Sequence, residues 1–241
     1  MKNRMMIVAT FLILLMAMAV APAMGENTKL WDVYNNVLKK AKYVDLTHAF
    51  SPTIAVWPGF GQAKFKPSVA GKKYDGYCEI GEAFDYKKHG FIATSYELVT
   101  DQYGTQLDPP AHFYEYGATI SDLPATYAIR PLVIIDIHEK VKKDPGYHAT
   151  IADIKAWEAK YGKIPEGSVV AVRSDWYKKW KETDRFAKKP FPGTKLDALK
   201  LLHLERKILF HGHEPLDTDT TPNLEGENWL LKNNFCQAEG M

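Results

Sequence analysis

Apolar residues in the first half of the chain follow two different spacings. Leu30, Val33 and Val37 recur at helical intervals, which predicts an amphipathic helix over 29–42. Residues 92–100 instead alternate between apolar and polar side chains, which predicts a half-buried strand. The stretch between these two elements is punctuated by glycines and prolines, so we expect it to form loops.

The second half of the chain contains short apolar runs between helical patterns. Residues 131–137 and 169–173 are rich in branched side chains, as buried strands are, and 207–210 is predicted as a third strand. Helical spacing predicts helices over 196–202 and 227–239. Together with a loop-rich, antiparallel first half, these interleaved elements predict an α/β (α+β) fold with a mixed sheet and flanking helices.

One further helix is marked at both of its ends. Thr150, with Asp153 three residues later, forms a capping-box pattern in which each side chain bonds the backbone N–H of the other residue. Gly162 is placed to end this helix, because glycine readily adopts the conformations that terminate helices. We therefore expect a helix between Thr150 and Gly162.

The N-terminal residues have the order of a secretory signal peptide. Lys2 and Arg4 precede an apolar run over 5–20, and small residues at 23–25 suit a cleavage site. We therefore expect cleavage of residues 1–25 and a secreted or periplasmic protein without a stable membrane anchor. An uncleaved anchor is the alternative, which the shortness of the apolar run disfavours.

Charge and cysteine content limit the possible partners. The whole chain carries a formal charge of +2, and removal of Lys2 and Arg4 brings it to zero. A neutral protein lacks the basic surface that nucleic-acid binding requires, so we expect no nucleic-acid partner. Cys78 and Cys236 allow one disulfide in an exported protein, but their spacing leaves open whether they pair.

The segment 102–113 concentrates the candidate chemistry of the chain. Gly104 permits unusual backbone angles, whereas Pro109 and Pro110 restrict them, so the segment can hold side chains in one geometry. An ordinary turn rich in glycine and proline is the alternative interpretation. The side chains along the segment that can ligate a cation or move a proton are Gln102, Gln106, Asp108 and His112.

These residues resemble the signature of a known family. Residues 102–112 are similar to the motif His-x-Gly-Thr-His-x-Asp-x-Pro-x-His of the cyclase family, which includes kynurenine formamidase (arylformamidase) and isatin hydrolase. The glycine, threonine, aspartate, proline and final histidine match at every spacing, but Gln102 and Gln106 stand where the two leading histidines belong. The segments 45–59 and 131–137 also resemble the family's opening strand and a later strand.

The resemblance implies an architecture for the chain. It predicts a swivelling β/β/α fold as a single domain over 43–241, preceded by an N-terminal helix over 26–42, and assembly as a homodimer or larger homo-oligomer. The final segment resembles the family's His-x-x-Leu-Leu pattern followed by a glutamate: Leu230, Leu231 and Glu239 match, and Glu227 takes the place of the histidine. Family members continue with another strand after this glutamate. Because the sequence stops at Met241, we expect a C-terminally truncated product.

The resemblance also implies a divalent metal ion and a proton carrier. His112 keeps the acid/base position of the motif, which suits a side chain whose charge changes near neutral pH. Glu225 is an alternative to Glu227 in the ligand set. Carried over by position, the candidate ligands are Gln102, Gln106, Asp108, Glu227 and Glu239.

Every one of these candidate ligands binds through oxygen. Imidazole ligands suit zinc, copper or iron, whereas amide and carboxylate oxygens suit manganese, magnesium or calcium. We therefore expect manganese, magnesium or calcium before zinc. Glutamine is a poor ligand, so the alternative is a site that has lost its metal.

The spacing of the two glutamates conflicts with one continuous helix. Glu227 and Glu239 are twelve residues apart, which is a rise of roughly 18 Å along a straight helix. Both can reach one metal ion if Glu227 belongs to a loop or if the helix is broken, for which Asn233 and Asn234 are the expected place.

Aromatic side chains suggest where a small-molecule substrate binds. Trp57 and Tyr103 are the candidates for substrate contact, whereas Phe113 and Trp176 are expected in the core. Among other polar residues, His211 and His213 are expected in ordinary loop roles before metal binding, and Asp217 and Asp219 in loop capping.

The resulting functional prediction is a metal-dependent hydrolase that cleaves a carbon–nitrogen bond in a small aromatic or cyclic amide. The resemblance implies arylformamidase activity, although replacement of the imidazole ligands argues against a true kynurenine formamidase. Two alternatives stay open at this point. One is a catalytically inactive protein that binds a small ligand on the same scaffold, and the other is a metal-dependent lyase.

Overall fold

The computed structural model describes residues 29–182 and 188–241. The chain divides into two units, of which the first ends at Asp45 and the second spans Leu46–Met241. The predicted signal peptide, residues 1–25, lies outside the described residues. Among the helices of the described ranges, none combines the length and the apolar character that a membrane crossing needs.

The first unit contains a helix over 29–36 and the 3₁₀ helix η1 (Leu38–Lys40). The predicted helix over 29–42 is therefore too long. Its regular turns stop at Val37, whose φ of −120° and ψ of −69° are not helical. Leu30 and its apolar neighbours on this helix are exposed, and a short helix gains little stability without a buried face.

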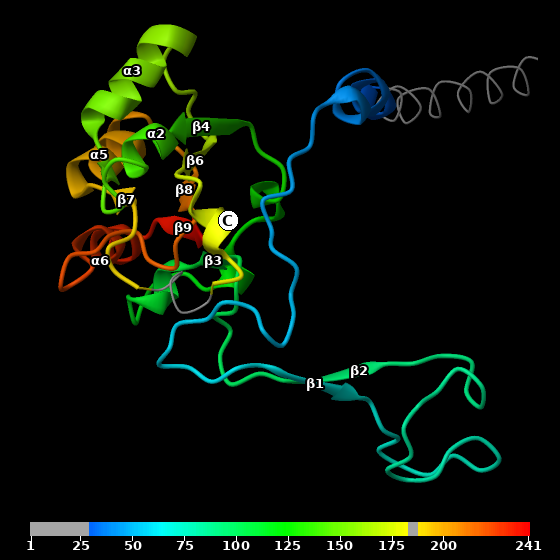
Figure 1. Ribbon diagram of the computed structural model, residues 1–241. Coiled ribbons are helices and arrows are strands. Elements are labelled where there is room, and N and C mark those ends of the chain that lie inside the picture. The colour runs from blue at the N-terminus through cyan, green and yellow to red at the C-terminus, as the bar shows by residue number, and fades with distance from the viewer. Residues whose placement is uncertain (1–28, 183–187) are drawn as a thin grey trace, which may run out of the picture. The chain divides into compact units, whose positions relative to one another are not determined.

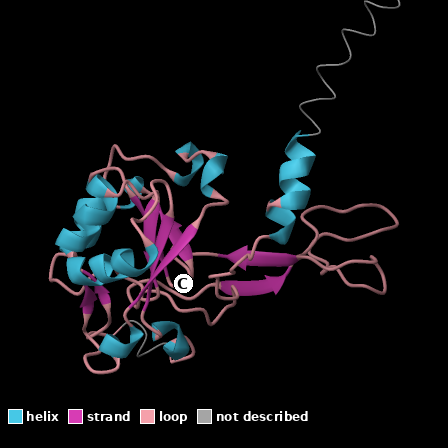
Figure 2. Ribbon diagram, turned by 90° about the horizontal axis from the view of Figure 1, so that it is seen from above, coloured by secondary structure: helices cyan, strands magenta, loops and turns pink. Residues whose placement is uncertain are grey.

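The second unit is built on a five-stranded mixed sheet with the strand order β3-β9-β8-β6-β4 (Figure 1). Four strands, β4, β6, β8 and β9, run parallel to one another, and β3 is antiparallel to β9. Figure 2 shows these strands crossing at successive angles, as expected for a twisted sheet. The strands are β3 (Gln106–Asp108), β4 (Leu132–Asp136), β6 (Val169–Arg173), β8 (Phe210–His213) and β9 (Cys236–Glu239).

Helices α3, α5 and α6 lie together on one side of the strands (Figure 1). The α-helices of this unit are α2 (His138–Val141), α3 (Ile151–Tyr161), α5 (Leu196–Lys200) and α6 (Glu225–Lys232). The π-helix η6 (Leu201–Glu205) continues α5. The 3₁₀ helices are η2 (Pro110–His112), η3 (Ile120–Asp122), η4 (Ala125–Tyr127) and η5 (Trp176–Lys179).

The predicted capping box begins α3. The Thr150 hydroxyl accepts a hydrogen bond from the Asp153 backbone N–H at 3.4 Å, and the Asp153 carboxylate accepts one from the Thr150 backbone N–H at 2.8 Å. The helix ends at Tyr161, and Gly162 follows with a φ of +92°. The sequence signals for this helix are therefore confirmed at both ends.

The hydrophobic core lies between the helices and one half of the sheet. Val133 on β4 pairs with Val170 on β6, and the same face carries Ile135 paired with Val172. These side chains pack against Ile154 of α3 and residues of α5 and η6. Burial of each such side chain contributes about 1.5–3 kcal/mol, so this half of the sheet anchors the fold.

Two small sheets accompany the central one. The antiparallel pair β1 (Lys64–Pro67) and β2 (Thr94–Glu97) lies in the loop-rich region, and the parallel pair β5 (His148–Ala149) and β7 (Gly193–Thr194) lies near the core. The predicted strand over 92–100 is thus reduced to β2. Its partner β1 is only four residues long, and the ladder stops with that partner.

Three predicted boundaries in the second half are wrong. The strand predicted over 207–210 begins only at Phe210, because Lys207 has a φ of +51°, which lies outside the extended conformation of a strand. The helix predicted over 196–202 keeps α-helical form only to Lys200. The final helix predicted over 227–239 ends at Lys232, and β9 follows it.

The break in this last element comes at the predicted place. Asn233 ends α6, and Asn234 has a φ of +64°, which reverses the chain into β9. Strands and helices around a mixed sheet confirm the predicted α/β (α+β) class. Cys78 and Cys236, whose pairing the sequence left open, are both buried and free.

Candidate active site

The two neighbouring strands β3 and β9 place four polar side chains on one face of the sheet. Gln106 pairs with Glu239, and Asp108 pairs with Gln237. Because alternate residues of a strand share a face, these four side chains form the corners of a square. His211 on β8 pairs with Gln237 and extends the same face. The face is therefore apolar on β4 and β6 and becomes polar on β8, β9 and β3.

The two glutamines cross-link the two carboxylates of this square. The Gln237 amide nitrogen donates to Asp108 Oδ2 at 3.2 Å and to Glu239 Oε1 at 2.8 Å. From the opposite side, the Gln106 amide nitrogen donates to Asp108 Oδ1 at 3.3 Å, to Glu239 Oε2 at 3.2 Å and to the Gln102 side-chain oxygen. Asp108 is 0% exposed and Glu239 is 3% exposed, so solvent does not satisfy them.

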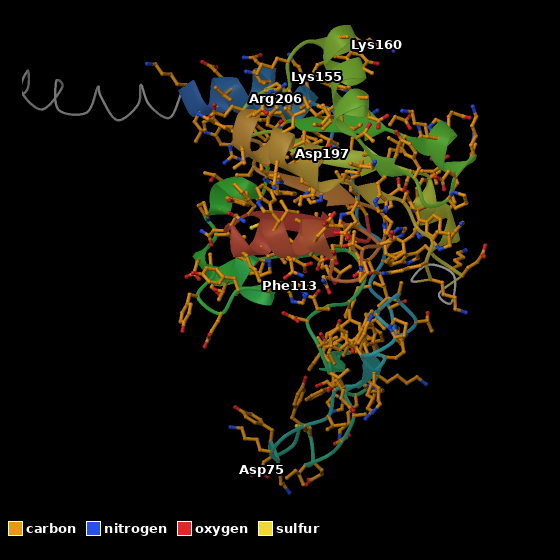
Figure 3. All side chains as sticks on the ribbon, turned by 90° about the vertical axis from the view of Figure 1, so that its left-hand side faces the viewer. Asp75, Phe113, Lys155, Lys160, Asp197 and Arg206 are labelled. Carbon is orange, nitrogen blue, oxygen red and sulfur yellow. The ribbon has the colours of Figure 1, made fainter. Side chains whose placement is uncertain are left out.

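Helix α6 and the 3₁₀ helix η2 bring two more groups to the square. Asp108, His112 and Glu227 each offer one potential ligand atom, and these atoms lie within 4.8 Å of one another. Phe113, directly after η2, lies beside α6 in Figure 3. Asp219 accepts a hydrogen bond from the Gly226 backbone N–H at 2.8 Å and thereby caps the N-terminus of α6, which fixes Glu227.

The glycine and threonine of the segment 102–113 hold β3 in place. Gly104 has a φ of +65°, and a Cβ there would overlap the Ile54 side chain, so only glycine fits without strain. The Thr105 hydroxyl donates to the Gly240 carbonyl at 2.5 Å. This bond ties the start of β3 to the end of β9, and it keeps Gln106 opposite Glu239.

Three buried carboxyl groups, Asp108, Glu227 and Glu239, and the half-buried Asp217 affect one another electrostatically in this site. Burial raises the pKa of Asp217 to about 6 and of Glu227 to about 8, and the charges of Asp217 and Asp108 add to the rise at Glu227. Burial, followed by the charges of the other three groups, raises the pKa of Glu239 well above its usual value. Burial also raises the pKa of Asp108. The protein thus concentrates acidic groups without an equal number of basic ones beside them.

A cavity of about 310 Å³ opens onto these groups. Trp57 and Phe60 meet edge to face at its aromatic side, with ring centroids 5.2 Å apart. The lining residues are Trp57, Phe60, Gln102, Gln106, His112, Phe113, Leu216, Asp217, Leu224, Glu227 and Glu239.

The structure brings most of the predicted site residues to this cavity, with two differences among the aromatic residues. Tyr103, predicted to contact substrate, is buried beside Ile54 and Ala63, and its hydroxyl donates to the Gly61 carbonyl at 2.8 Å. Its position in the core satisfies both its ring and its hydroxyl. Phe113, expected in the core, is instead part of the cavity lining.

In the second half of the chain, the structure agrees with some of the predicted residue roles and differs from others. Glu227 is buried and lines the cavity, whereas its alternative Glu225 is exposed. Trp176 is buried in the core as expected. Asp219 is a loop and helix cap as expected, but Asp217 lines the cavity.

Sequence reasoning missed Gln237 and the site position of Asp217. Gln237 lies two residues before Glu239, and strand alternation would have placed both on one face. The erroneous helix over 227–239 concealed this signal. Asp217 follows β8 in a loop, where its type and spacing do not distinguish a cavity residue from a capping residue.

Three buried histidines, His211 and His213 on β8 and His203 on η6, lie close to one another near Glu239. His213 Nε2 is 3.5 Å from Glu239 Oε1, and its ring stacks on His211 with centroids 5.5 Å apart. Burial lowers the pKa of His213 and of His203 to about 3, and it also lowers the pKa of His211. These histidines are therefore neutral at physiological pH. Glu214 has a structural role, because its carboxylate accepts hydrogen bonds from Ser174 and Tyr177.

The donor set of the site fits a hard divalent cation. The Gln106 side-chain oxygen is buried and has no hydrogen-bond partner among the described residues. Three buried carboxyls, Asp108, Glu227 and Glu239, lie in the same site and are costly to ionise together without a cation. Oxygen donors of this kind suit manganese, magnesium or calcium.

Comparisons with known proteins agree with the fold and with the motif. A model of the family described as "Putative cyclase" matches residues 44–220. Isatin hydrolase of Roseibium aggregatum is 31% identical over 193 residues, which cover 75% of this chain and 69% of that protein.

Solved structures of isatin hydrolases share the fold. Isatin hydrolase A from Labrenzia aggregata, bound to benzyl benzoate, has a TM-score of 0.70 at 21% identity and covers 88% of this chain and 85% of its own. An isatin hydrolase bound to the product analogue thioisatinate has a TM-score of 0.69 at 24% identity, with coverage of 90% and 85%. The chain therefore belongs to the cyclase family, whose model matches residues 44–220, and it is similar to isatin hydrolase over 75% of its length.

Proposed function

We propose that this chain is a metal-dependent hydrolase that cleaves the carbon–nitrogen bond of a small aromatic or cyclic amide. The observation that carries the proposal is the approach of Asp108, His112 and Glu227 to within 4.8 Å at a cavity that also has an aromatic side. Candidate metal ligands, a candidate proton carrier and an apolar surface for a ring thus lie together at a cavity of about 310 Å³.

Asp108, Glu227 and Glu239 would hold the cation, with the Gln102 amide oxygen as a further ligand. Gln106 would become an amide-oxygen ligand by turning its amide over, because its nitrogen faces Asp108 and Glu239 in the structure. When bound, a divalent cation supplies a Lewis acid for the amide carbonyl and makes a water molecule more acidic. Manganese is the metal that we favour, with magnesium and calcium as the next candidates and zinc after them.

His112 would move the proton between the attacking water and the leaving nitrogen. It belongs to the cavity lining and is exposed, so it can exchange protons with solvent between turnovers. Histidine suits the role because its charge changes near neutral pH. Trp57 and Phe60 would contact the substrate ring through their faces and edges.

The lining of the cavity and the similarity to isatin hydrolase support a proposal for the substrate class. Trp57 and Glu227 both line the cavity, so an aromatic ring against Trp57 would leave an attached amide within the same cavity as the carboxylates. Isatin hydrolase is named for a cyclic amide, and we infer that lactams fused to an aromatic ring are better substrates than N-aryl formamides. An arylformamidase-like reaction on an open-chain formamide requires the same residues and is the second activity to assay.

The test is hydrolysis of an aromatic lactam and an aryl formamide by purified protein before and after EDTA treatment. We expect EDTA to abolish hydrolysis and manganese to restore it, whereas hydrolysis that persists after complete removal of metal would refute the metal-dependent reaction. His112→Gln should lower kcat by about 100- to 10,000-fold. His138→Gln is the matched control, because His138 begins α2 and pairs with Asp136.

Calorimetry with manganese separates the two possible roles of His112. Retained affinity in His112→Gln together with a low kcat supports proton transfer. A loss of affinity in the same variant would contradict that role and make His112 a ligand.

One observation favours a second candidate, a binding protein without catalytic activity. The Gln106 amide nitrogen already bridges Asp108 and Glu239, which partly replaces the attraction that a cation would provide. Metal analysis of protein purified without chelator distinguishes the candidates. A stoichiometric divalent metal supports the hydrolase, and a trace amount supports the binding protein.

A further inference from the structure

The Gln237 side chain forms hydrogen bonds with two candidate metal ligands and with a threonine. Its amide nitrogen donates to Asp108 Oδ2 at 3.2 Å and to Glu239 Oε1 at 2.8 Å, and its amide oxygen accepts a hydrogen bond from the Thr218 hydroxyl. The side chain is 0% exposed. A buried amide is costly unless it is hydrogen-bonded, and this one directs both of its donor bonds to candidate metal ligands.

The neighbours of Gln237 determine the orientation of its amide. With the nitrogen toward Asp108 and Glu239, both N–H groups meet carboxylate acceptors, whereas the opposite orientation would place the amide oxygen against both carboxylates. The Thr218 hydroxyl then completes the arrangement by donating to the oxygen. The Thr218 backbone N–H also lies 3.5 Å from Glu227 Oε2, so one short segment contacts all three acidic ligands directly or through Gln237.

We propose that Gln237, oriented by Thr218, is a positioning residue that holds the carboxylates of Asp108 and Glu239 in fixed orientations for binding a divalent cation. This inference rests on the proposed metal-dependent function. When both carboxyls lose their protons to bind a cation they repel each other, and an amide that donates to both keeps them turned toward the same point. The cation then binds to groups already in place, and less binding energy is spent on ordering them.

The position of Gln237 on β9 explains why this residue can act on both ligands. It is the cross-strand partner of Asp108, and it precedes Glu239 by two residues on the same face. An apolar residue there would continue the hydrophobic face of β4 and β6 and would simplify packing. The chain instead has a polar side chain at a fully buried place, where its contacts are with Asp108, Glu239 and Thr218.

The test is the affinity of metal-free protein for manganese, measured by calorimetry in the full chain. Gln237→Met preserves the length of the side chain and removes the amide. We expect it to weaken manganese binding by about 10- to 100-fold, the usual effect of losing a group that orients a metal ligand. Thr218→Val should weaken binding less. The double variant should match Gln237→Met alone, because Thr218 acts through Gln237.

Ser168→Ala is the matched control. Ser168 is also fully buried, and its hydroxyl donates to the Pro165 carbonyl at 2.8 Å, away from the carboxylates. Thermal unfolding of each metal-free variant establishes that it is folded, and Thr218→Val provides the test if Gln237→Met does not fold. Unchanged manganese affinity in the folded variants would overturn this inference and leave the proposed function intact. An equal loss in Ser168→Ala would overturn it as well, and absence of binding to the wild type would overturn both.

Discussion

The buried carboxyl groups make the stability of the metal-free protein depend on pH in an unusual direction. The ordinary pKa of a glutamate is 4.5, and that of Glu227 in the folded protein is about 8. Between these two values the folded protein keeps a proton that the unfolded chain has released. A rise in pH therefore favours unfolding, because the unfolded state binds fewer protons than the folded state.

The size of the effect follows from the pKa shift. Each pKa unit corresponds to about 1.4 kcal/mol, so Glu227 alone contributes a loss of about 5 kcal/mol between pH 4.5 and pH 8. The pKa of Asp217 rises from 3.8 to about 6, so its contribution to stability is lost over a lower pH range than that of Glu227. The two groups repel each other, so their losses overlap and are not added. A loss of 5 kcal/mol is comparable with the whole stability of many domains, which is about 5–15 kcal/mol.

The assay is urea unfolding in EDTA at a series of pH values from 5 to 8.5, followed by tryptophan fluorescence. We expect the unfolding midpoint to fall steadily over this range. Glu227→Gln should flatten the curve and should be more stable than the wild type near pH 8.5. A midpoint that is constant or that rises with pH in EDTA would refute the reasoning.

Manganese should reverse this dependence. The cation binds the ionised carboxylates and competes with protons, so the stabilisation that it provides should increase with pH. At a concentration 100 times the dissociation constant, it should contribute about 2.7 kcal/mol near pH 8. The control is Glu225→Gln, because Glu225 is exposed on the same helix and should leave both curves unchanged.

Two further predictions concern the cavity wall and the backbone. Trp57→Ala should raise KM for an aromatic amide by roughly 2- to 10-fold at nearly constant kcat, because an aromatic contact contributes about 0.5–1.5 kcal/mol. An unchanged KM in steady-state kinetics would exclude ring contact with Trp57. Gly104→Ala should destabilise the protein by more than the 1–3 kcal/mol or so of a strained left-handed residue, because the new Cβ also overlaps Ile54. Gly162→Ala is the matched control in thermal unfolding, since Gly162 has a positive φ but open space around it; equal losses in both variants would show that the overlap with Ile54 has no effect.

Local signals in the sequence predicted those parts of the fold that depend on local physics. The helix after Thr150 and the strand β6 have the predicted bounds, because a capping box and a run of buried branched residues act within one element. The motif 102–112 similarly located Asp108 and His112. In contrast, the sequence indicated where the final helix would break but not that it does break, because asparagine adopts the left-handed conformation of Asn234 in only a minority of positions.

Gln237 could not be assigned to the site from sequence, because it meets the motif residues through the register of two paired strands. Gln237 belongs to the site because it pairs with Asp108, which lies on a strand more than 100 residues away in the chain. Tyr103 lies beside the motif residues, yet the backbone turn at Gly104 points it into the core. A place close to the motif in sequence therefore does not decide whether a side chain belongs to the site.

The neutral histidines between the apolar core and the carboxylates separate two parts of the protein with opposite requirements. His211 and His213 remain uncharged, and their stacked rings fill space without needing a counterion. On β8 these two rings lie between the valines of β6 and the strands β9 and β3, which carry Glu239 and Asp108. Loading or loss of a cation can therefore change the charge of the site while the packing beneath the helices stays the same.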